Sequence, residues 1–277
     1  MSEQRKSPTL KWAGGKSQLL DVLQSKMPKS YNRYFEPFIG GGALFLSVSP
    51  QYAVINDTNE QLINLYCQLR SSYMDVIHTI DKLDNIPCDK NFYLSMRTKY
   101  NEKILHHELD SECAALMIWV NKHCFNGLYR VNRKGMFNVP YNNKTGGKSI
   151  DENNLIAIGK YLQSSDVEIL NSDFEVTCSS VRKDDFVYFD SPYVPVSETA
   201  YFTDYTMDGF TLNDHKRLSE LFKQLDKIGA KIMLSNNDVS LVRSLYKGYN
   251  IQSVGVKRMI NRDASKRTGQ EVIITNY

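Results

Sequence analysis

Short apolar runs of strand length recur near the start of the chain and again after about residue 165. The early runs are Tyr34 to Ile39 and Ala53 to Ile55, and the later ones are Val167 to Leu170, Phe186 to Phe189, Lys231 to Leu234 and Val272 to Thr275. A helical pattern, Leu212 to Ile228, separates two of the later runs. Strands that alternate with helices predict an α/β fold with a largely parallel, twisted sheet.

The middle of the chain follows a different period. From about Glu60 to Lys122, apolar residues recur every three or four positions, which predicts helices. Two short alternating runs then flank residues 132–135, a pattern typical of a β-hairpin, and a polar connector follows over residues 142–154. We therefore expect residues 1–59 and 150–277 to form one domain, with a helical segment, 60–149, inserted into it.

Composition sets only broad limits on the class of protein. The chain has 277 residues and a net charge of +3, which permits nucleic-acid binding without arguing for it. No stretch reaches the roughly 20 apolar residues of a membrane span, and the polar start has no signal-peptide core, so we expect a cytoplasmic protein. The five cysteines are odd in number and scattered, which favours reduced packing thiols and no metal site.

The run Phe186 to Phe189 is followed directly by Asp190, Ser191, Pro192 and Tyr193. Ligands of open α/β sheets bind outside the carboxyl ends of the strands. A carboxylate, a turn stiffened by proline and an aromatic ring at such a point can hold a planar amino group of a base. The alternative is a strand that ends in an ordinary proline turn with a surface tyrosine, and other segments must decide.

Three glycines, Gly40 to Gly42, follow the first strand-like run and precede a helix-like segment. They would let the backbone approach a nucleotide-like ligand at a helix N-terminus. Asp57 lies 17 residues beyond Gly40, close to the spacing at which an acidic residue takes ribose hydroxyls. The alternative is a plain glycine turn with Asp57 as a helix N-cap. A dinucleotide motif would need glycine where Phe45 stands.

Two segments end in Gly-Lys-Ser, at residues 15–17 and 147–149, but neither fits a phosphate-binding P-loop. The first glycine of that motif would fall at Leu10 or at Asn142. An NTPase is therefore disfavoured. In the first segment Trp12 still offers a stacking face and Lys16 a cation.

Six segments together resemble the DNA adenine methylase (Dam) family and occur in its order. They are Lys11 to Lys16, Phe35 to Gly42, Asn56–Asp57, Phe125 to Asn132, Phe137 to Tyr141, and Asp190 to Tyr193. The resemblance spans nearly the whole chain. It implies a Rossmann-like methyltransferase sheet, with residues 60–149 as the inserted target-recognition domain that carries the hairpin.

The activity implied is transfer of a methyl group from S-adenosyl-L-methionine to the N6 amine of adenine in double-stranded DNA, usually within GATC, by base flipping. Such enzymes serve restriction-modification or DNA replication, and we expect a monomer without an obligate protein partner. The cofactor contacts implied are Trp12, Lys16, Gly40, Asp57, Asp190 and, at the cofactor adenine, Asp173 and Phe174. Asp190 would also accept from the target amine, and Tyr193 would stack on the flipped base.

The resemblance also implies which residues read the DNA. Arg130 would contact guanine and Leu128 a thymine methyl, although an isolated arginine would more simply be solvated. The remaining contacts implied are Lys11, Phe125, Asn126, Asn132, Asn138 and Pro140. Asn143 and Lys144 depart from the family pattern. Arg258, Arg262, Lys266 and Arg267 would be either phosphate ligands or solvated charges.

One departure falls in the strand-end motif itself, because the family usually has two prolines there and this chain has Ser191. A backbone carbonyl at that position is the usual acceptor from the amine, and serine retains it, so we expect activity with a less rigid loop. Two rivals stay open: methylation of cytosine N4, and a catalytically silent DNA-binding protein.

Overall fold

The computed structural model describes residues 5–196, 209–257 and 268–277. The chain forms two compact units. The first, which we call the helical unit, comprises Met1–Gly15, Ile39–Gln51 and Asp57–Asn171. The second, the sheet unit, comprises Lys16–Phe38, Tyr52–Asn56 and Ser172–Tyr277. The predicted insertion, 60–149, lies within the helical unit, which also includes segments from the start of the chain; the boundaries of functional domains stay a prediction.

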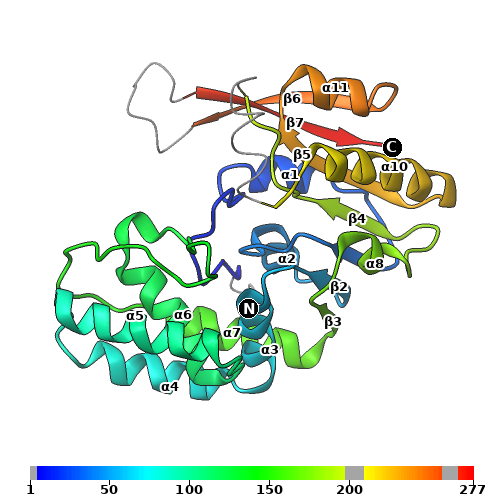
Figure 1. Ribbon diagram of the computed structural model, residues 1–277. Coiled ribbons are helices and arrows are strands. Elements are labelled where there is room, and N and C mark those ends of the chain that lie inside the picture. The colour runs from blue at the N-terminus through cyan, green and yellow to red at the C-terminus, as the bar shows by residue number, and fades with distance from the viewer. Residues whose placement is uncertain (1–4, 197–208, 258–267) are drawn as a thin grey trace. The chain divides into compact units, whose positions relative to one another are not determined.

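Seven strands are ordered β3-β2-β1-β4-β5-β7-β6 in a mixed sheet (Figure 1). The strands are β1 Tyr34–Glu36, β2 Tyr52–Asn56, β3 Asp166–Leu170, β4 Phe186–Phe189, β5 Lys231–Asn237, β6 Asn250–Lys257 and β7 Thr268–Thr275. Within the sheet unit, β1 pairs in parallel with β2 and β4, and β4 pairs in parallel with β5. The largely parallel arrangement is confirmed for these strands.

The structure corrects the sequence prediction at two places in the sheet. The strand expected over Tyr34 to Ile39 ends at Glu36, because Pro37 has no N–H to continue the ladder. β6 was not predicted, and β7 runs antiparallel to both β5 and β6. The sheet therefore combines a parallel part with an antiparallel part.

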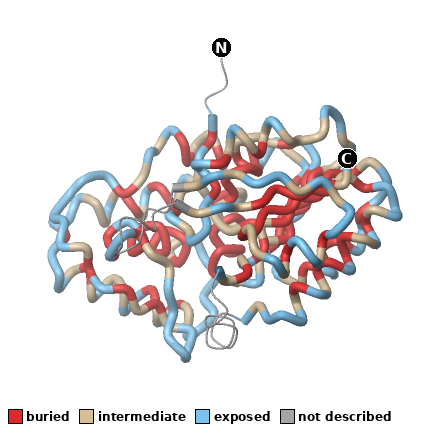
Figure 2. Tube along the Cα trace, turned by 90° about the horizontal axis from the view of Figure 1, so that it is seen from above, coloured by how far each residue is buried: buried red, intermediate tan, exposed pale blue. Residues whose placement is uncertain are grey.

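Strand β4 forms the centre of the core in the sheet unit, and all four of its residues have no exposed surface. Buried residues, red in Figure 2, run along the strands near the C-terminus. Helix α10, Leu212–Ile228, packs against β5. It begins with a capping box between Thr211 and Asp214 and ends at Gly229, whose φ of 88° suits glycine. The other helices in the described residues of this unit are α1 Leu20–Lys26, α8 Phe174–Cys178 and α11 Ser240–Leu245.

The helical unit is built around α6, Ser111–His123, which packs against α3, α4 and α5. Every residue of α6 from Cys113 to Asn121 is buried. Helices α3, α5, α6 and α7 each begin at an Asn or Asp whose side chain accepts from a backbone N–H three residues later. The bounds are α2 Ala43–Val48, α3 Glu60–Ser71, α4 Tyr73–Asp84, α5 Lys90–Leu105, α7 Glu152–Ser164 and the 3-10 turn η1 Phe125–Gly127. The helices predicted from about Glu60 to Lys122 are confirmed.

The predicted hairpin is a chain reversal with an isolated bridge rather than a ladder of two strands. Val131 bridges Phe137, and the Asn132 N–H donates to the Met136 carbonyl at 2.9 Å. On the other side of the bridge the Asn138 N–H donates to the Arg130 carbonyl at 3.1 Å. The N–H and carbonyl of Phe137 face away from Val131 and bond the side chain of Asn101 at 2.8 and 3.0 Å. Asn101 on α5 thereby ties the reversal to the helices.

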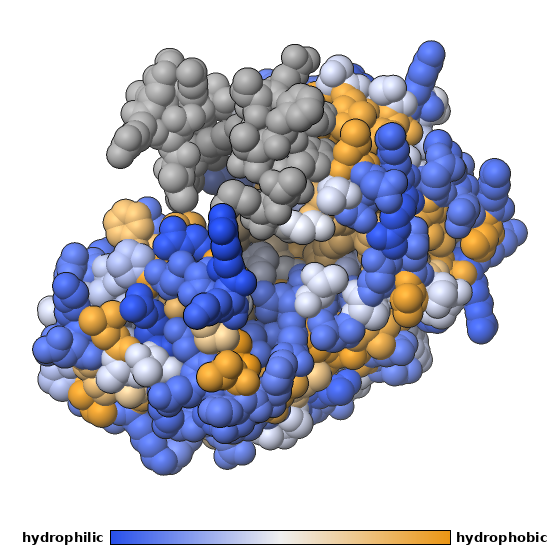
Figure 3. All heavy atoms as spheres, in the orientation of Figure 1, coloured by the Kyte–Doolittle hydropathy of each residue, from blue (hydrophilic) through white to orange (hydrophobic). Residues whose placement is uncertain are grey.

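Hydrophilic residues predominate on the face drawn in Figure 3, with hydrophobic residues scattered among them. Scattered apolar side chains are normal on the surface of a globular protein. No helix in the described part of the chain is both long enough and apolar enough to cross a bilayer.

The buried imidazole of His215, in the first turn of α10, makes stability depend on pH. Burial lowers its pKa from the ordinary 6.5 to about 4, although Asp214 opposes this. Between these two pKa values the His215 imidazole is protonated in the unfolded chain and neutral in the folded chain. The free energy of unfolding therefore falls as the pH falls, by about 3 kcal/mol in all. In denaturant titrations, the free energy of unfolding should drop between pH 7 and pH 4.5 by about 2.5 kcal/mol less in His215→Leu than in wild type. An equal loss in both proteins would contradict this account.

Candidate functional site

Asp190 follows the last residue of β4, and Lys16 and Ser235 of the sheet unit bind its carboxylate directly. Lys16 Nζ lies 2.7 Å from Asp190 Oδ1 in an ion pair whose lysine is 6% exposed. The hydroxyl of Ser235 on β5 donates to the same oxygen at 3.1 Å. The hydroxyls of Ser235 and Tyr188 are in turn 2.9 Å apart. We call Lys16, Tyr188, Asp190 and Ser235 the Asp190 cluster.

The environment of Asp190 works on its pKa in two directions. Burial raises the pKa of the carboxyl above its ordinary value, while Lys16 and the hydrogen bond from Ser235 lower it. The net effect is a rise. The cation nevertheless favours the ionised form, so the cluster presents a carboxylate that was desolvated in advance of any ligand.

Tyr193 is held at both ends of its side chain. Its hydroxyl donates to Glu271 Oε2 on β7 at 2.8 Å. Lys16 Nζ lies over its ring, 4.5 Å from the centroid, in a cation–π contact. The tyrosine ring is therefore fixed beside the Asp190 cluster, which argues against an ordinary proline turn with a free surface tyrosine.

Between these two residues, Ser191 is 2% exposed and Pro192 is exposed. Within the described residues, Ser191 Oγ is a buried polar atom without a hydrogen-bond partner. The chain beyond is anchored by β5, because Asn236 Oδ1 accepts from the Val194 N–H and Asn237 Nδ2 donates to the Val194 carbonyl, at 2.9 and 2.6 Å. The loop that carries Ser191 is thus held in place by strand ends.

Sequence reasoning missed the supporting residues Ser235, Asn236, Asn237 and Glu271. A signal for the first three was present, because Ser235-Asn236-Asn237 follows the apolar part of β5 in the same way that Asp190 follows β4. Glu271 gave no such signal, because its importance depends on the antiparallel placement of β7.

In the helical unit, the loop Gly40–Gly42 packs against Trp12. Gly40 has a φ of +47°, and a Cβ built on it would lie 3.0 Å from Trp12 Cδ1. Its N–H donates to Asp57 Oδ2 at 3.1 Å, and its carbonyl accepts from the Tyr66 hydroxyl at the same distance. Glycine is required here by both the backbone angle and the close approach of the indole.

Asp57 was open to interpretation as a helix N-cap, and that alternative is wrong. Asn59 caps α3, while Asp57 Oδ1 accepts from the Asn59 N–H at 2.9 Å. Burial raises the pKa of Asp57, and the backbone N–H groups that it accepts from oppose the rise. The carboxylate therefore links the glycine loop to the start of α3.

The structure places Asp173 and Phe174 at the start of α8 in the sheet unit. Asp173 caps this helix, and its Oδ1 also pairs with Arg217 Nη2 at 2.9 Å. The ring of Phe174 is buried and lies 5.4 Å from the ring of Phe38. Asp173 is thus engaged with protein groups, and the buried ring of Phe174 contacts both Phe38 and the Arg217 guanidinium, which lies 4.8 Å from its centroid.

The segments expected to read DNA are held together by Asn121 of α6. Its side chain accepts from the Lys11 N–H at 2.9 Å and donates to the carbonyls of Lys11 and Gly127 at 3.1 and 3.0 Å. Lys11 and the turn η1 are therefore neighbours in this unit. In that turn, Asn126 has a φ of 57° and Phe125 is 52% exposed.

Several of the expected DNA contacts have structural roles in the chain reversal. Arg130 is exposed, and its Nε donates to Asn138 Oδ1 at 2.8 Å. Asn132 Oδ1 accepts from the backbone N–H groups of Lys134 and Met136. The Pro140 carbonyl accepts from the Phe125 N–H. Arg258, Arg262, Lys266 and Arg267 lie outside the described residues.

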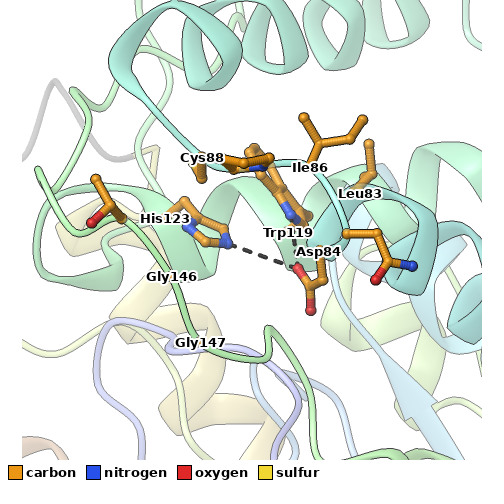
Figure 4. A pocket seen from close by; sticks show the side chains of 11 residues that line it. Leu83, Asp84, Ile86, Cys88, Trp119, His123, Gly146 and Gly147 are labelled. Carbon is orange, nitrogen blue, oxygen red and sulfur yellow. Dashed lines mark hydrogen bonds and ion pairs between the residues drawn. The ribbon is translucent and has the colours of Figure 1, made fainter.

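In the second Gly-Lys-Ser segment, Ser149 donates hydrogen bonds to a carboxylate of the protein itself. Asp84 accepts from the Ser149 N–H at 2.7 Å, from its hydroxyl at 2.5 Å, and from Trp119 Nε1 at 3.0 Å. Figure 4 shows Asp84 facing Trp119 and His123 in a pocket of about 240 Å³. A buried carboxylate in this position repels phosphate, which agrees with the failed P-loop motif.

The groups now described fit the chemistry of S-adenosyl-L-methionine. A glycine cradle beside an indole, carboxylates for hydroxyl and ammonium groups, a lysine for a carboxylate, and an aromatic surface for adenine are all present in the chain. The family profile described as D12 class N6 adenine-specific DNA methyltransferase matches residues 12–260. The chain belongs to this family. Enzymes of the family transfer the methyl group of S-adenosyl-L-methionine, so this is the cofactor of the chain.

Full-length relatives agree with this assignment. A type II methyltransferase of Lactococcus lactis subsp. cremoris is 42% identical over 98% of this chain and 95% of its own length. A type II methyltransferase of Methanocaldococcus jannaschii is 39% identical over 98% of this chain and 99% of its own. The DNA adenine methylase of Escherichia coli K12 is 30% identical over 97% and 94%. The resemblance inferred from the six motifs is confirmed.

Gly40→Ala should disturb Trp12 as well as the backbone. A left-handed φ costs an L-residue roughly 1–2 kcal/mol, and the new methyl group must also displace the indole. Gly135→Ala is a matched control, because Gly135 has a φ of +76° with nothing within 4 Å of its Cβ position. Denaturant unfolding should show the larger loss of stability for Gly40→Ala, with a change in tryptophan fluorescence that the control lacks. Equal losses with unchanged fluorescence would contradict the packing described.

Proposed function

We propose that this adenine-specific DNA methyltransferase acts within GATC and rotates the target adenine out of the duplex. The observation that carries the proposal is the Asp190 cluster beside the fixed ring of Tyr193. An amine inside a stacked base pair cannot reach a carboxylate at a strand end, so the base must leave the stack. The expected monomeric state and cytoplasmic location remain predictions.

When bound, S-adenosyl-L-methionine supplies an electrophilic methyl group. Asp190 accepts a hydrogen bond from the adenine N6 amine, and the backbone carbonyl of Ser191 accepts from its other hydrogen. Two acceptors draw electron density toward the nitrogen, whose lone pair is otherwise delocalised into the ring. Methyl transfer would form the nitrogen–carbon bond as the bond from that carbon to the cofactor sulfur breaks, leaving S-adenosyl-L-homocysteine, and Asp190 would take the proton that the nitrogen loses.

Tyr193 stacks on the extruded adenine in this proposal. Base–aromatic stacking contributes about 1–3 kcal/mol and requires a ring in a fixed orientation. The hydrogen bond from Tyr193 to Glu271 and the contact with Lys16 provide that orientation. The ring rather than the hydroxyl should then carry the interaction with the base.

The cofactor is held, in the same proposal, by Trp12, Gly40 and Asp57 from the glycine loop and its neighbours, and by Lys16 and Asp190 from the cluster. Phe174 contributes an apolar surface for the adenine ring of the cofactor. Asp173 contributes less than the family resemblance implies, because Arg217 already neutralises its charge at 2.9 Å.

The substrate-reading residues are Lys11, Leu128 and Arg130, with Phe125 and Asn126 entering the space near the extruded adenine. Arg130 is exposed and braced by Asn138, so its guanidinium is oriented before DNA arrives. An arginine oriented in this way suits a bidentate contact with guanine in the major groove. Asn132 and Pro140 act through the shape of the reversal.

A catalytically silent relative is the alternative that Ser191 raises. Within the described residues the buried hydroxyl of Ser191 has no hydrogen-bond partner, which is unusual in a strand-end motif. The acceptor needed for the reaction is the backbone carbonyl, however, and serine retains it. Methyl transfer measured with labelled cofactor on duplex DNA decides between the two, and N6-methyladenine in the digested product is the result that we expect.

Asp190→Ala should lower single-turnover methyl transfer by about 100- to 1,000-fold, because it removes a preorganised charged acceptor. Asp238→Ala is the control, since it removes a carboxylate of the same unit that pairs with Arg243 at 2.6 Å. The wild-type rate should fall as the pH falls through the Asp190 pKa, which burial raises. A variant rate within threefold of wild type would refute this role for Asp190.

Arg130→Ala should relax specificity rather than weaken DNA binding uniformly. A bidentate contact to guanine discriminates bases by about 1–3 kcal/mol, whereas a phosphate contact does not discriminate. Rates on duplexes that differ from GATC at one guanine should rise relative to GATC. Arg133→Ala, at an exposed arginine of the same reversal, should leave this ratio unchanged. A uniform fall across the duplexes for Arg130→Ala would make it a phosphate anchor.

A further inference from the structure

Tyr129 lies between two of the residues proposed to read DNA, and its ring packs against the protein. Leu128 has extended backbone angles, φ −72° and ψ 139°. Arg130 is exposed, whereas Leu128 and Tyr129 are half-buried. The Arg130 side chain is therefore open to solvent, while the Tyr129 ring packs on the helical unit.

The ring of Tyr129 stacks on the indole of Trp12. Their centroids are 4.9 Å apart with an interplanar angle of 28°. The same indole contacts Gly40, where an added Cβ would meet it at 3.0 Å. A continuous packed column therefore runs from the segment Leu128–Arg130 through Tyr129 and Trp12 to the glycine loop, all within the helical unit.

Polar contacts fix the far end of the Tyr129 side chain. Its hydroxyl lies 3.2 Å from the hydroxyl of Tyr100, which is fully buried. Burial raises the pKa of this hydroxyl, the side chain of Asn59 acts to lower it, and the Asn59 N–H donates to Asp57 Oδ1 at 2.9 Å. Tyr129 is thus connected to Trp12 by its ring and to Asp57 by its hydroxyl.

We propose that Tyr129 is a positioning residue that couples DNA recognition to cofactor binding. This inference rests on the proposed function, in which Leu128 and Arg130 contact DNA while Trp12, Gly40 and Asp57 contact the cofactor. When the cognate sequence holds Leu128 and Arg130, the backbone between them is fixed and the Tyr129 ring holds Trp12 in the orientation that the cofactor needs. A non-cognate sequence leaves this segment, and with it the indole, less restrained.

The coupling must be reciprocal, because it is a difference in binding free energy. Cognate DNA tightens cofactor binding by a certain factor, and the cofactor tightens binding of cognate DNA by the same factor. Coupled sites commonly show factors of about 5- to 150-fold. Replacing a residue whose only role is structural would change the affinity for the cofactor equally with cognate and with non-cognate DNA. The ratio of these two affinities would then stay the same.

The test measures the affinity for S-adenosyl-L-homocysteine, the demethylated product of the cofactor, which allows binding without reaction. Each protein is titrated alone, with a duplex that carries the methylated sequence found by product mapping, and with a duplex in which that sequence is scrambled. Wild type should bind more tightly, by about fivefold or more, with the cognate duplex than with the scrambled one. Tyr129→Leu should reduce this ratio to nearly one.

Tyr129→Phe is the matched variant, because it keeps the stacked ring and removes the hydroxyl. We expect it to retain most of the cognate-to-scrambled ratio, and thermal unfolding should show that both variants are folded. A wild-type ratio in Tyr129→Leu would overturn the inference, and so would an equal loss in the Phe variant, since the stack would then not be the link. If wild type binds S-adenosyl-L-homocysteine and methylates DNA but has a cognate-to-scrambled affinity ratio of one, the inference fails and the proposed function stands. Absence of both binding and methylation in wild type would overturn both.

Discussion

The ion pair between Lys16 and Asp190 is the interaction on which the arrangement of the sheet unit depends. The lysine is 6% exposed and the aspartate side chain 19%, so both charges have lost most of their hydration. Such a pair adds little net stability, yet removing one partner leaves a buried charge uncompensated, at a cost of about 3–5 kcal/mol. The geometry of β4, β5 and β7 around this pair is therefore strongly restricted. Each of the three strands contributes an acceptor or donor, through Asp190, Ser235 and Glu271.

This restriction explains how a short motif can act on an exocyclic amine. The carboxylate is desolvated and oriented before any ligand arrives, so little reorganisation is needed when the amine binds. Lys16 serves two purposes, because it keeps Asp190 in its ionised form and also lies over the ring of Tyr193. Charge and stacking are thus set by the same side chain. The glycine loop of the helical unit follows similar logic, since Asp57 fixes Gly40 and the missing Cβ leaves room for Trp12.

The sequence predicted the parts of the fold that local patterns determine. β4 and α10 have the predicted bounds, because a continuous apolar run and an amphipathic period each identify one type of element. β6 was missed because its sequence alternates weakly and the strand depends on pairing with β7. The expected hairpin is reduced to the bridge between Val131 and Phe137, and Asn101, distant in sequence, binds the outward-facing N–H and carbonyl of Phe137. The motif residues could be read from the sequence, and Ser235 left a local signal after the apolar part of β5, whereas Glu271 supports Tyr193 through a tertiary contact that no local pattern encodes.

In the proposed function, the Asp190 carboxylate and the Tyr193 ring act on adenine N6 within one short DNA sequence. Modified-base sequencing of DNA from a host without its own DNA methylation that expresses this chain tests this proposal. We expect N6-methyladenine at nearly every GATC and almost none elsewhere. Methylated cytosine, or adenine methylation spread without a sequence preference, or no modified base in the presence of soluble protein, would contradict it.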